Sequence, residues 1–155
     1  MAQPVIGDIA PDFNLPEDLN GTLTLSSLRG QKVVLFFYPK DDTSGCTKES
    51  IAFSALKAEF EKADTVIVGI SPDTVAKHQK FRTKHNLTTL LVADEERTAL
   101  EAYGVWVQKS MYGRKYMGVE RTTFLIDREG KIAQIWNKVK VAGHAEAVLA
   151  EAQAL

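Results

Sequence analysis

The stretch KVVLFFYPKDDTSGCTKES, residues 32–50, joins an apolar run, a polar loop and the start of an amphipathic segment. Its first seven residues are rich in β-branched and aromatic side chains and stop at Pro39, which is typical of a strand buried on both faces. We therefore predict a central parallel strand, a loop, and a helix over residues 46–62 with Cys46 at or near its N-terminus. The apolar positions that recur at helical spacing in this helix are Ile51, Ala52, Ala55, Leu56 and Phe60.

The segments that follow repeat the order of strand and helix. Residues 65–70 are predicted as a strand, and Ser71–Asp73 as the N-cap cluster of a helix that runs to His85. Residues 90–92 are predicted as a further strand and residues 95–103 as a short helix. This alternation is the βαβ signature of a parallel sheet, so the fold class is α/β.

The two ends of the chain complete this prediction. Residues 1–30 are expected to form a preamble with a short edge strand or hairpin arm at residues 21–25. We predict a basic, glycine-containing loop over residues 108–118, of a length that is often functional in compact domains. An antiparallel hairpin is predicted over residues 122–136, and a closing helix over residues 143–155. A single domain, residues 1–155, is expected.

The composition excludes several classes of protein. Among 155 residues, 45% are hydrophobic and 25% charged, and the formal net charge is −1, so neither nucleic acid nor an anionic membrane is an expected partner. The longest apolar run, residues 33–38, is far shorter than the roughly 20 residues that span a bilayer. The first residues lack the pattern of a secretory signal, so the expected location is cytoplasmic. The single cysteine excludes an intrachain disulfide and a multi-thiolate metal site.

The loop before Cys46 contains the spacing Pro-x-x-x-Thr-x-x-Cys in Pro39, Thr43 and Cys46. This spacing resembles the peroxidatic-cysteine motif of peroxiredoxins. The run YPKDDTSGCT is similar to the active-site loop of the bacterioferritin-comigratory-protein or PrxQ subfamily, and GVWVQKSMYGRKYMGVERTTFLID resembles a later block of the same subfamily. The resemblance covers almost the whole chain.

The resemblance implies a thioredoxin-like fold, with a central mixed β-sheet flanked by helices, and a thiol peroxidase that needs no cofactor. It implies that Cys46 reduces hydrogen peroxide or organic hydroperoxides and becomes a sulfenic acid. Thr43, Arg121 and Pro39 are implied as its catalytic partners, with Gly45 and Glu49 as supporting residues. The implied reductant is an external thiol, with thioredoxin, glutaredoxin or glutathione as candidates. A monomer or weak homodimer is expected.

The chemistry of peroxide reduction sets demands on the cysteine. An ordinary thiol is only about 3% ionised at pH 7, whereas the thiolate is the nucleophile. A helix N-terminus and the guanidinium of Arg121 would both stabilise the thiolate. Thr43, Arg121 and the amides of Gly45 and Cys46 are the expected donors to the peroxide, and Pro39 is expected to shield the sulfur without offering an N–H.

Each of these residues also has a structural reading. A lone cysteine is often a small buried hydrophobic residue, Thr43 a loop hydroxyl, and Arg121 a surface cation. Glu49 in the first helical turn would also complement the helix dipole without any role at a site. Two rival functions stay open: a redox sensor oxidised once, and a thiol–disulfide oxidoreductase, although the C-x-x-C pair of such enzymes is absent.

The sequence departs from the subfamily at the second cysteine. Ile51 stands five residues after Cys46, where many members carry a resolving cysteine, and no later cysteine replaces it. The resemblance is therefore to a one-cysteine variant. We expect the Ile51 side chain to be buried at the start of the apolar stripe of its helix.

The remaining polar side chains point to no second site. Asp41 and Asp42 are expected to be solvated in their polar loop. The three histidines lie in polar, helical contexts, so we predict no metal site and no Cys–His pair. They are His78, His85 and His144.

Overall fold

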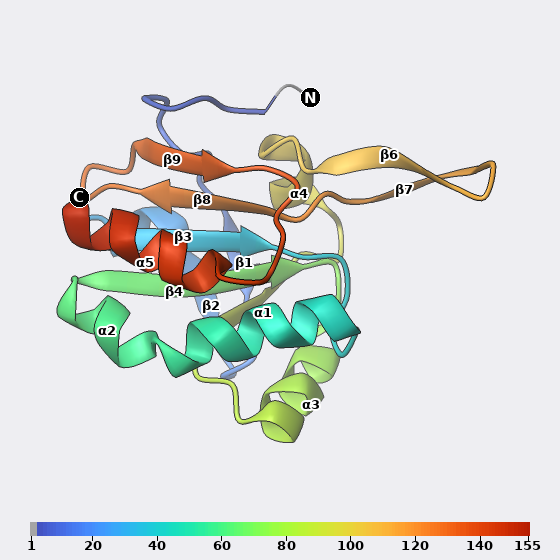
Figure 1. The fold of residues 1–155 in the computed structure, drawn as a ribbon, viewed down its shortest axis with the longest axis horizontal. Helices are drawn as coiled ribbons and strands as arrows, with labels where there is room; N and C mark the ends of the chain where they lie inside the picture. Colours follow the sequence, from blue (N-terminus) through green and yellow to red (C-terminus); the bar gives the residue numbers. More distant parts are fainter. Residues whose placement is uncertain (1–2) are drawn as a thin grey trace.

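Five strands form the central sheet of the computed structural model, which describes residues 3–155 (Figure 1). Their order is β5-β4-β3-β8-β9; β3, β4 and β5 run parallel, and β8 and β9 are antiparallel to their neighbours. The predicted central strand and the predicted mixed sheet of an α/β fold are both confirmed. The strands are β3 (Lys32–Phe37), β4 (Thr65–Ser71), β5 (Leu90–Ala93), β8 (Thr122–Ile126) and β9 (Ile132–Trp136).

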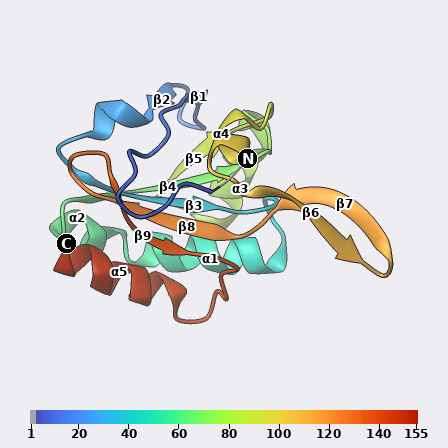
Figure 2. The ribbon, with the colours of Figure 1, turned by 90° about the horizontal axis from the view of Figure 1, so that it is seen from above.

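The other elements cover both faces of this sheet. In Figure 2, α1, α2 and α5 lie on one side of it, and β1, β2 and α4 lie on the other. The helices are α1 (Ser44–Ala55), α2 (Lys57–Lys62), α3 (Val75–His85), α4 (Thr98–Ala102) and α5 (His144–Ala154). The remaining short elements are β1 (Asn14–Pro16), β2 (Thr22–Thr24) and the 3-10 helix η1 (Leu25–Leu28). β1 and β2 pair as an antiparallel hairpin, as expected for a hairpin arm near residues 21–25.

Strand β3 separates two apolar clusters because its side chains alternate between the faces of the sheet. Val33, Leu35 and Phe37 belong to one cluster, and residues 34, 36 and 38 to the other, where the side chains of α1, α2, α3 and α5 meet them. Each such buried apolar side chain contributes about 1.5–3 kcal/mol. A Cβ at Gly69 would lie 2.7 Å from the Phe36 ring, so glycine on β4 makes room for that ring.

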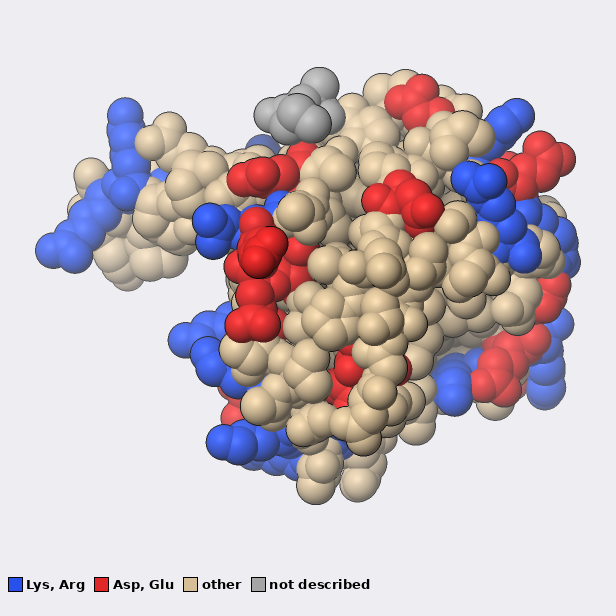
Figure 3. Space-filling view, turned by 180° about the vertical axis from the view of Figure 1, so that it is seen from behind, with Lys and Arg blue, Asp and Glu red and all other residues tan. Residues whose placement is uncertain are grey.

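The predicted loop over residues 108–118 is instead an antiparallel hairpin. Strands β6 (Trp106–Met111) and β7 (Arg114–Val119) are joined by Tyr112 and Gly113, both with positive φ, a two-residue turn that suits the twist of a hairpin. The hairpin projects from the body of the molecule, and Lys and Arg side chains stand out at its end (Figures 1 and 3). The prediction was wrong because both faces of a projecting hairpin are solvated, so no apolar alternation marks its strands.

Three predicted helices have different bounds in the structure. The predicted helix over residues 46–62 is two helices, because the backbone leaves the α conformation at Leu56, between α1 and α2. The N-cap of α3 is Thr74, whose hydroxyl accepts from the Lys77 amide, whereas Ser71 still belongs to β4. The short helix α4 begins only at Thr98, after Arg97 with φ 64°.

The C-terminal elements agree with the sequence prediction. β8 and β9 form the predicted hairpin, with a register shift at Leu125 and Ile126, and α5 is the predicted closing helix. Within residues 3–155, we find no helix whose length and hydrophobicity would let it span a membrane.

Candidate active site

Cys46 lies in the first turn of α1, directly after the loop that leaves β3. The first hydrogen bond of the helix runs from the Thr47 amide to the Thr43 carbonyl. The amides of residues 44–46 therefore have no carbonyl partner within the helix. Cys46 is 1% exposed and lies in the apolar cluster of the helix-covered face. The partial positive charge of the α1 N-terminus therefore acts on a sulfur atom that is shielded from solvent.

Arg121 supplies the charged partner of this sulfur. It precedes β8, the neighbour of β3, and its Nη2 donates to Cys46 Sγ over 3.1 Å. Burial alone would lower the pKa of Arg121, but the negative charges of Glu49 and Cys46 raise it. The guanidinium is thus a permanent cation in contact with the sulfur, which a merely structural, apolar cysteine does not require.

Glu49 anchors the same guanidinium from one turn further along α1. Arg121 Nη1 donates to Glu49 Oε1 over 2.6 Å, and Glu49 is 1% exposed. Burial raises the pKa of Glu49 to about 7, although Arg121 opposes this shift. Oε2 of Glu49 is buried without a hydrogen-bond partner among the described residues. Glu49 is therefore more than an exposed carboxylate that complements a helix dipole.

Gly45 lies against Arg121 in this pair, and Pro39 lies in the loop that leads to it. A Cβ at Gly45 would lie 3.1 Å from Arg121 Nη2, so glycine lets the guanidinium approach the start of α1. Pro39 is half-buried immediately after β3. The structure thus brings Cys46, Arg121, Glu49 and Gly45 together, as expected from the sequence.

Thr43 occupies the N-cap position of α1 and is exposed. Its hydroxyl makes no capping bond and instead donates to the Lys40 carbonyl over 2.8 Å. Because the hydroxyl proton is used in this way, the oxygen retains its lone pairs as a hydrogen-bond acceptor. This differs from the expected role of Thr43 as a donor.

Lys109 was not predicted from the sequence to lie near Cys46, because residues 108–118 were predicted to form a loop. It lies on β6, paired with Tyr116 of β7 in the middle of the projecting hairpin, and is half-buried. Burial and the nearby Arg121 guanidinium lower the pKa of Lys109, while the Cys46 sulfur acts in the opposite direction. The hairpin therefore adds a second cation to the surroundings of Cys46.

Asp41, which was expected to be solvated, is buried, and so are two of the three histidines. Asp41 is 8% exposed and accepts a hydrogen bond from the Tyr38 hydroxyl. His78 is completely buried and lies 2.6 Å from Asp41. His144 is 6% exposed and contacts the Thr123 hydroxyl. The prediction for Asp41 was wrong because His78, which is distant in sequence, pairs with it in the folded chain. Asp42 is exposed, as expected.

The side chain of Ile51 is also placed differently from the prediction. It is 43% exposed, whereas Phe53 of the same helix is fully buried. The apolar face of α1 therefore lies toward Phe53, and Ile51 contributes little burial energy to the first turn.

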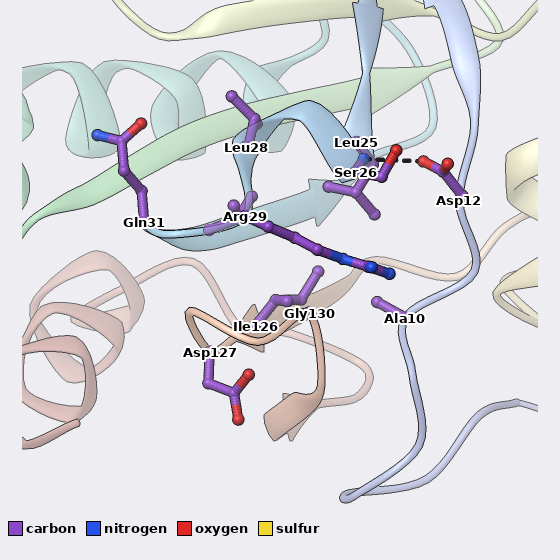
Figure 4. A pocket seen from close by; sticks show the side chains of 11 residues that line it. Ala10, Asp12, Leu25, Ser26, Leu28, Arg29, Gln31, Ile126, Asp127 and Gly130 are labelled. Carbon is purple, nitrogen blue, oxygen red and sulfur yellow. Dashed lines mark hydrogen bonds between the residues drawn. The ribbon is translucent and has the colours of Figure 1, made fainter.

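A small cavity lies at the other end of the sheet, near the start of β3 and the end of β8 (Figure 4). Its volume is about 10 Å³, room for one water molecule, and the Arg29 side chain extends across it. It is thus too small to serve as a substrate site. The residues that line it include Ala10, Asp12, Leu25, Ser26, Arg29, Ile126 and Gly130.

Comparisons with known proteins agree with this geometry. Residues 6–135 match the AhpC/TSA family. Peroxiredoxin Bcp of Bacillus subtilis is 49% identical over 139 residues, which cover 90% of this chain and 88% of the relative. The solved bacterioferritin comigratory protein of Xanthomonas campestris is 43% identical, with a TM-score of 0.88, and the match covers 92% of this chain and 90% of that one. A mutant of Xylella fastidiosa PrxQ gives 36% identity and a TM-score of 0.93, covering 99% and 98% of the two chains.

Proposed function

The chain belongs to the AhpC/TSA family and is a peroxiredoxin of the bacterioferritin-comigratory or PrxQ type, and we propose that Cys46 is its peroxidatic residue. Its fold is thioredoxin-like, and its activity is that of a thiol-dependent peroxidase. The observation that supports Cys46 most directly is the 3.1 Å contact between its sulfur and Arg121 Nη2.

In the first step the Cys46 thiolate attacks the terminal oxygen of a hydroperoxide. An S–O bond forms as the O–O bond breaks, and the leaving alkoxide or hydroxide takes up a proton to become alcohol or water. Cys46 is oxidised to a sulfenic acid and the peroxide is reduced. The alkyl peroxide reduction activity of the Xanthomonas campestris relative supports organic hydroperoxides, beside hydrogen peroxide, as the proposed substrates.

The surrounding residues have separate roles in this step. Arg121 stabilises the thiolate and the negative charge that develops on the leaving oxygen, as do the first amides of α1. Thr43 accepts a hydrogen bond from the peroxide and so orients it, because its own proton is donated to the Lys40 carbonyl. Pro39 shields the sulfur. Glu49 and Gly45 act through Arg121, the first by a hydrogen bond and the second by leaving it room.

The second half of the cycle requires a thiol from outside the chain, because Cys46 is its only cysteine. A thiol donor attacks the sulfenic acid and releases water, which leaves a mixed disulfide. A second thiol then releases the Cys46 thiolate and leaves the donor as a disulfide. Thioredoxin, glutaredoxin and glutathione are the proposed donors. We place this monomer or weak homodimer in the cytoplasm, where thiols are kept reduced.

Replacement of Cys46 by Ser tests the proposal. A serine hydroxyl is neither ionised nor oxidised at neutral pH, so C46S should consume no peroxide above the buffer rate, while its circular dichroism should match the wild type. With each donor in turn, the wild type should consume many equivalents of peroxide. Residual turnover in C46S would refute the role of Cys46, and consumption that stops at one equivalent with every donor would instead indicate a redox sensor.

A further inference from the structure

A buried polar cluster lies beside the loop that leads to Cys46, and the proposed reaction does not use it. It consists of Asp41, Asp73 and His78, which are 8%, 6% and 0% exposed. One potential metal-ligating atom from each residue lies within 4.8 Å of the others. Three residues of this kind in a buried position suggest either a metal site or a hydrogen-bond network, and their partners distinguish the two.

The atoms that would bind a metal already have partners in the protein. Nε2 of His78 contacts the Val92 carbonyl at 2.9 Å, and Nδ1 contacts Asp41 Oδ2 at 2.6 Å. Oδ1 of Asp41 accepts from the Tyr38 hydroxyl at 2.6 Å. Oδ2 of Asp73 accepts from the Asp41 amide at 2.8 Å. A cation would have to displace several of these bonds, so the cluster is a hydrogen-bond network rather than a metal site.

The hydrogen-bond partners of His78 indicate which of its ring nitrogens carry protons. The Val92 carbonyl can only accept, so Nε2 of His78 carries a proton. The short contact between Nδ1 and Asp41 Oδ2 holds a second proton. Burial alone would lower the pKa of His78, but the hydrogen bond and charge of Asp41 raise it above its ordinary value. His78 Nδ1 and Asp41 Oδ2 thus share this second proton, and the direction of the pKa shift of His78 favours an imidazolium paired with the Asp41 carboxylate.

The loop held by this pair carries the catalytic residues. Asp41 is fixed by both its amide and its carboxylate, midway between Pro39 and Thr43. Asp42 has φ 61°, and its carboxylate contacts Lys84 and His85 at the end of α3. Helix α3 thus contacts two consecutive loop residues: its residue His78 contacts Asp41, and its C-terminal end contacts Asp42. The position of the Thr43 hydroxyl depends on the shape of this loop, since the hydroxyl donates to the Lys40 carbonyl of the same loop.

We propose that Asp41 and His78 are positioning residues: their buried ion pair holds the loop in the shape that places Thr43 against a peroxide bound at Cys46. This inference rests on the proposed function. When the pair is lost, the thiolate persists but the orientation of the peroxide does not. A small alkylating reagent needs only an accessible thiolate, so its reaction does not depend on Thr43.

The test compares two reactions of Cys46 in Asp41→Asn and His78→Gln. We expect the rate constant for sulfenic acid formation with hydrogen peroxide to fall about ten- to a hundredfold, the cost of a misplacement near 1 Å. The rate of alkylation by iodoacetamide should fall less than about threefold or rise. Because the two residues act as one unit, the double variant should lose no more than the worse single variant. Rates are expressed per folded molecule, as measured by circular dichroism.

Asp18→Asn is the matched control. Asp18 is 3% exposed and pairs with Arg82 of the same helix α3, away from the loop. This variant should lower stability while the ratio of the peroxide rate to the alkylation rate stays at the wild-type value. An unchanged ratio in D41N and H78Q as well would overturn the proposal and leave the pair with a structural role alone.

A measurement on the wild type does not depend on whether these variants fold. Nitrogen NMR at pH 7 should show both ring nitrogens of His78 protonated. A neutral ring would overturn the ion pair. If the wild type itself forms no sulfenic acid with peroxide, the proposed function fails independently of the result for His78.

Discussion

At the scale of the residue, Arg121 joins two acidic groups through one guanidinium. Nη2 contacts the sulfur of Cys46 and Nη1 contacts Glu49. Replacement by Gln removes the positive charge next to the sulfur. A positive charge at such a distance typically favours the ionised form of an acidic group by about 1–3 pH units. R121Q should therefore be alkylated by iodoacetamide about tenfold or more slowly at pH 7, and the difference should disappear at a pH where both thiols are ionised. Arg114→Gln on the exposed hairpin is the control, and an R121Q profile that matches it would contradict the contact.

Thr43 is a second residue whose function can be separated from its structure. Thr43→Val keeps the shape of the side chain and removes the oxygen that is expected to accept from the peroxide. We expect a loss of at least about tenfold in the rate of peroxide reduction, with little change in alkylation. Thr43→Ser retains the hydroxyl and should stay close to the wild type. Equal losses in both reactions of T43V would show that Thr43 stabilises the loop and does not orient the peroxide.

At the scale of the element, α1 decides the fate of the oxidised cysteine. Residues 46 and 51 both lie in α1, where five residues advance about 7.5 Å and about 500°, so their side chains point roughly 140° apart. A disulfide between these positions requires the first turn of α1 to unwind. The exposure of Ile51, 43%, leaves little apolar burial that would oppose this unwinding.

Mass spectrometry of Ile51→Cys tests the flexibility of this turn. Without a thiol donor, one equivalent of peroxide should give the wild-type sulfenic acid, about +16 Da, and excess peroxide the sulfinic acid, about +32 Da. I51C should instead form an internal disulfide, about −2 Da, and I51S, the matched control, should follow the wild type. A mass of +32 Da in I51C at equal peroxide would show that α1 stays folded during oxidation.

The elements also show how far the sequence determines the site. The run over residues 32–38 predicted the central strand because its burial on both faces leaves a local signature in apolar density. Cys46 and Arg121 are 75 residues apart in the sequence. The residue pattern predicted only that one lies at a helix N-terminus and the other at the start of a strand. The expectation that they act together came from the family resemblance. The burial of Asp41 depends on His78, which is 37 residues away, so the residues next to Asp41 in the sequence do not predict it. A weak signal existed, because His78 and Phe81 are spaced to share the buried face of α3.

At the scale of the whole molecule, two buried groups on the same face of the sheet respond to pH in opposite directions. Burial raises the pKa of Glu49 from 4.5 to about 7. Burial lowers the pKa of His144 from 6.5 to about 4, and the Arg121 guanidinium acts in the same direction. As the pH falls from 7 to 4.5, the folded state takes up a proton at Glu49 before the unfolded state does, which stabilises the fold. Between pH 6.5 and 4, His144 takes up its proton only on unfolding, which destabilises the fold.

The two effects should nearly cancel in the wild type and separate in single variants. Each is worth at most about 3.5 kcal/mol, since one pKa unit corresponds to about 1.4 kcal/mol. Relative to the wild type, Glu49→Gln should lose stability as the pH falls from 7 to 4.5, because it retains the unfavourable protonation of His144 alone. His144→Asn should gain relative stability from pH 6.5 to 4. Urea unfolding at several pH values measures both differences, and the exposed carboxylates that titrate in the same range cancel between variant and wild type. Parallel curves for the wild type and E49Q would show that Glu49 is already ionised well below pH 7, so that Arg121 outweighs the cost of its burial.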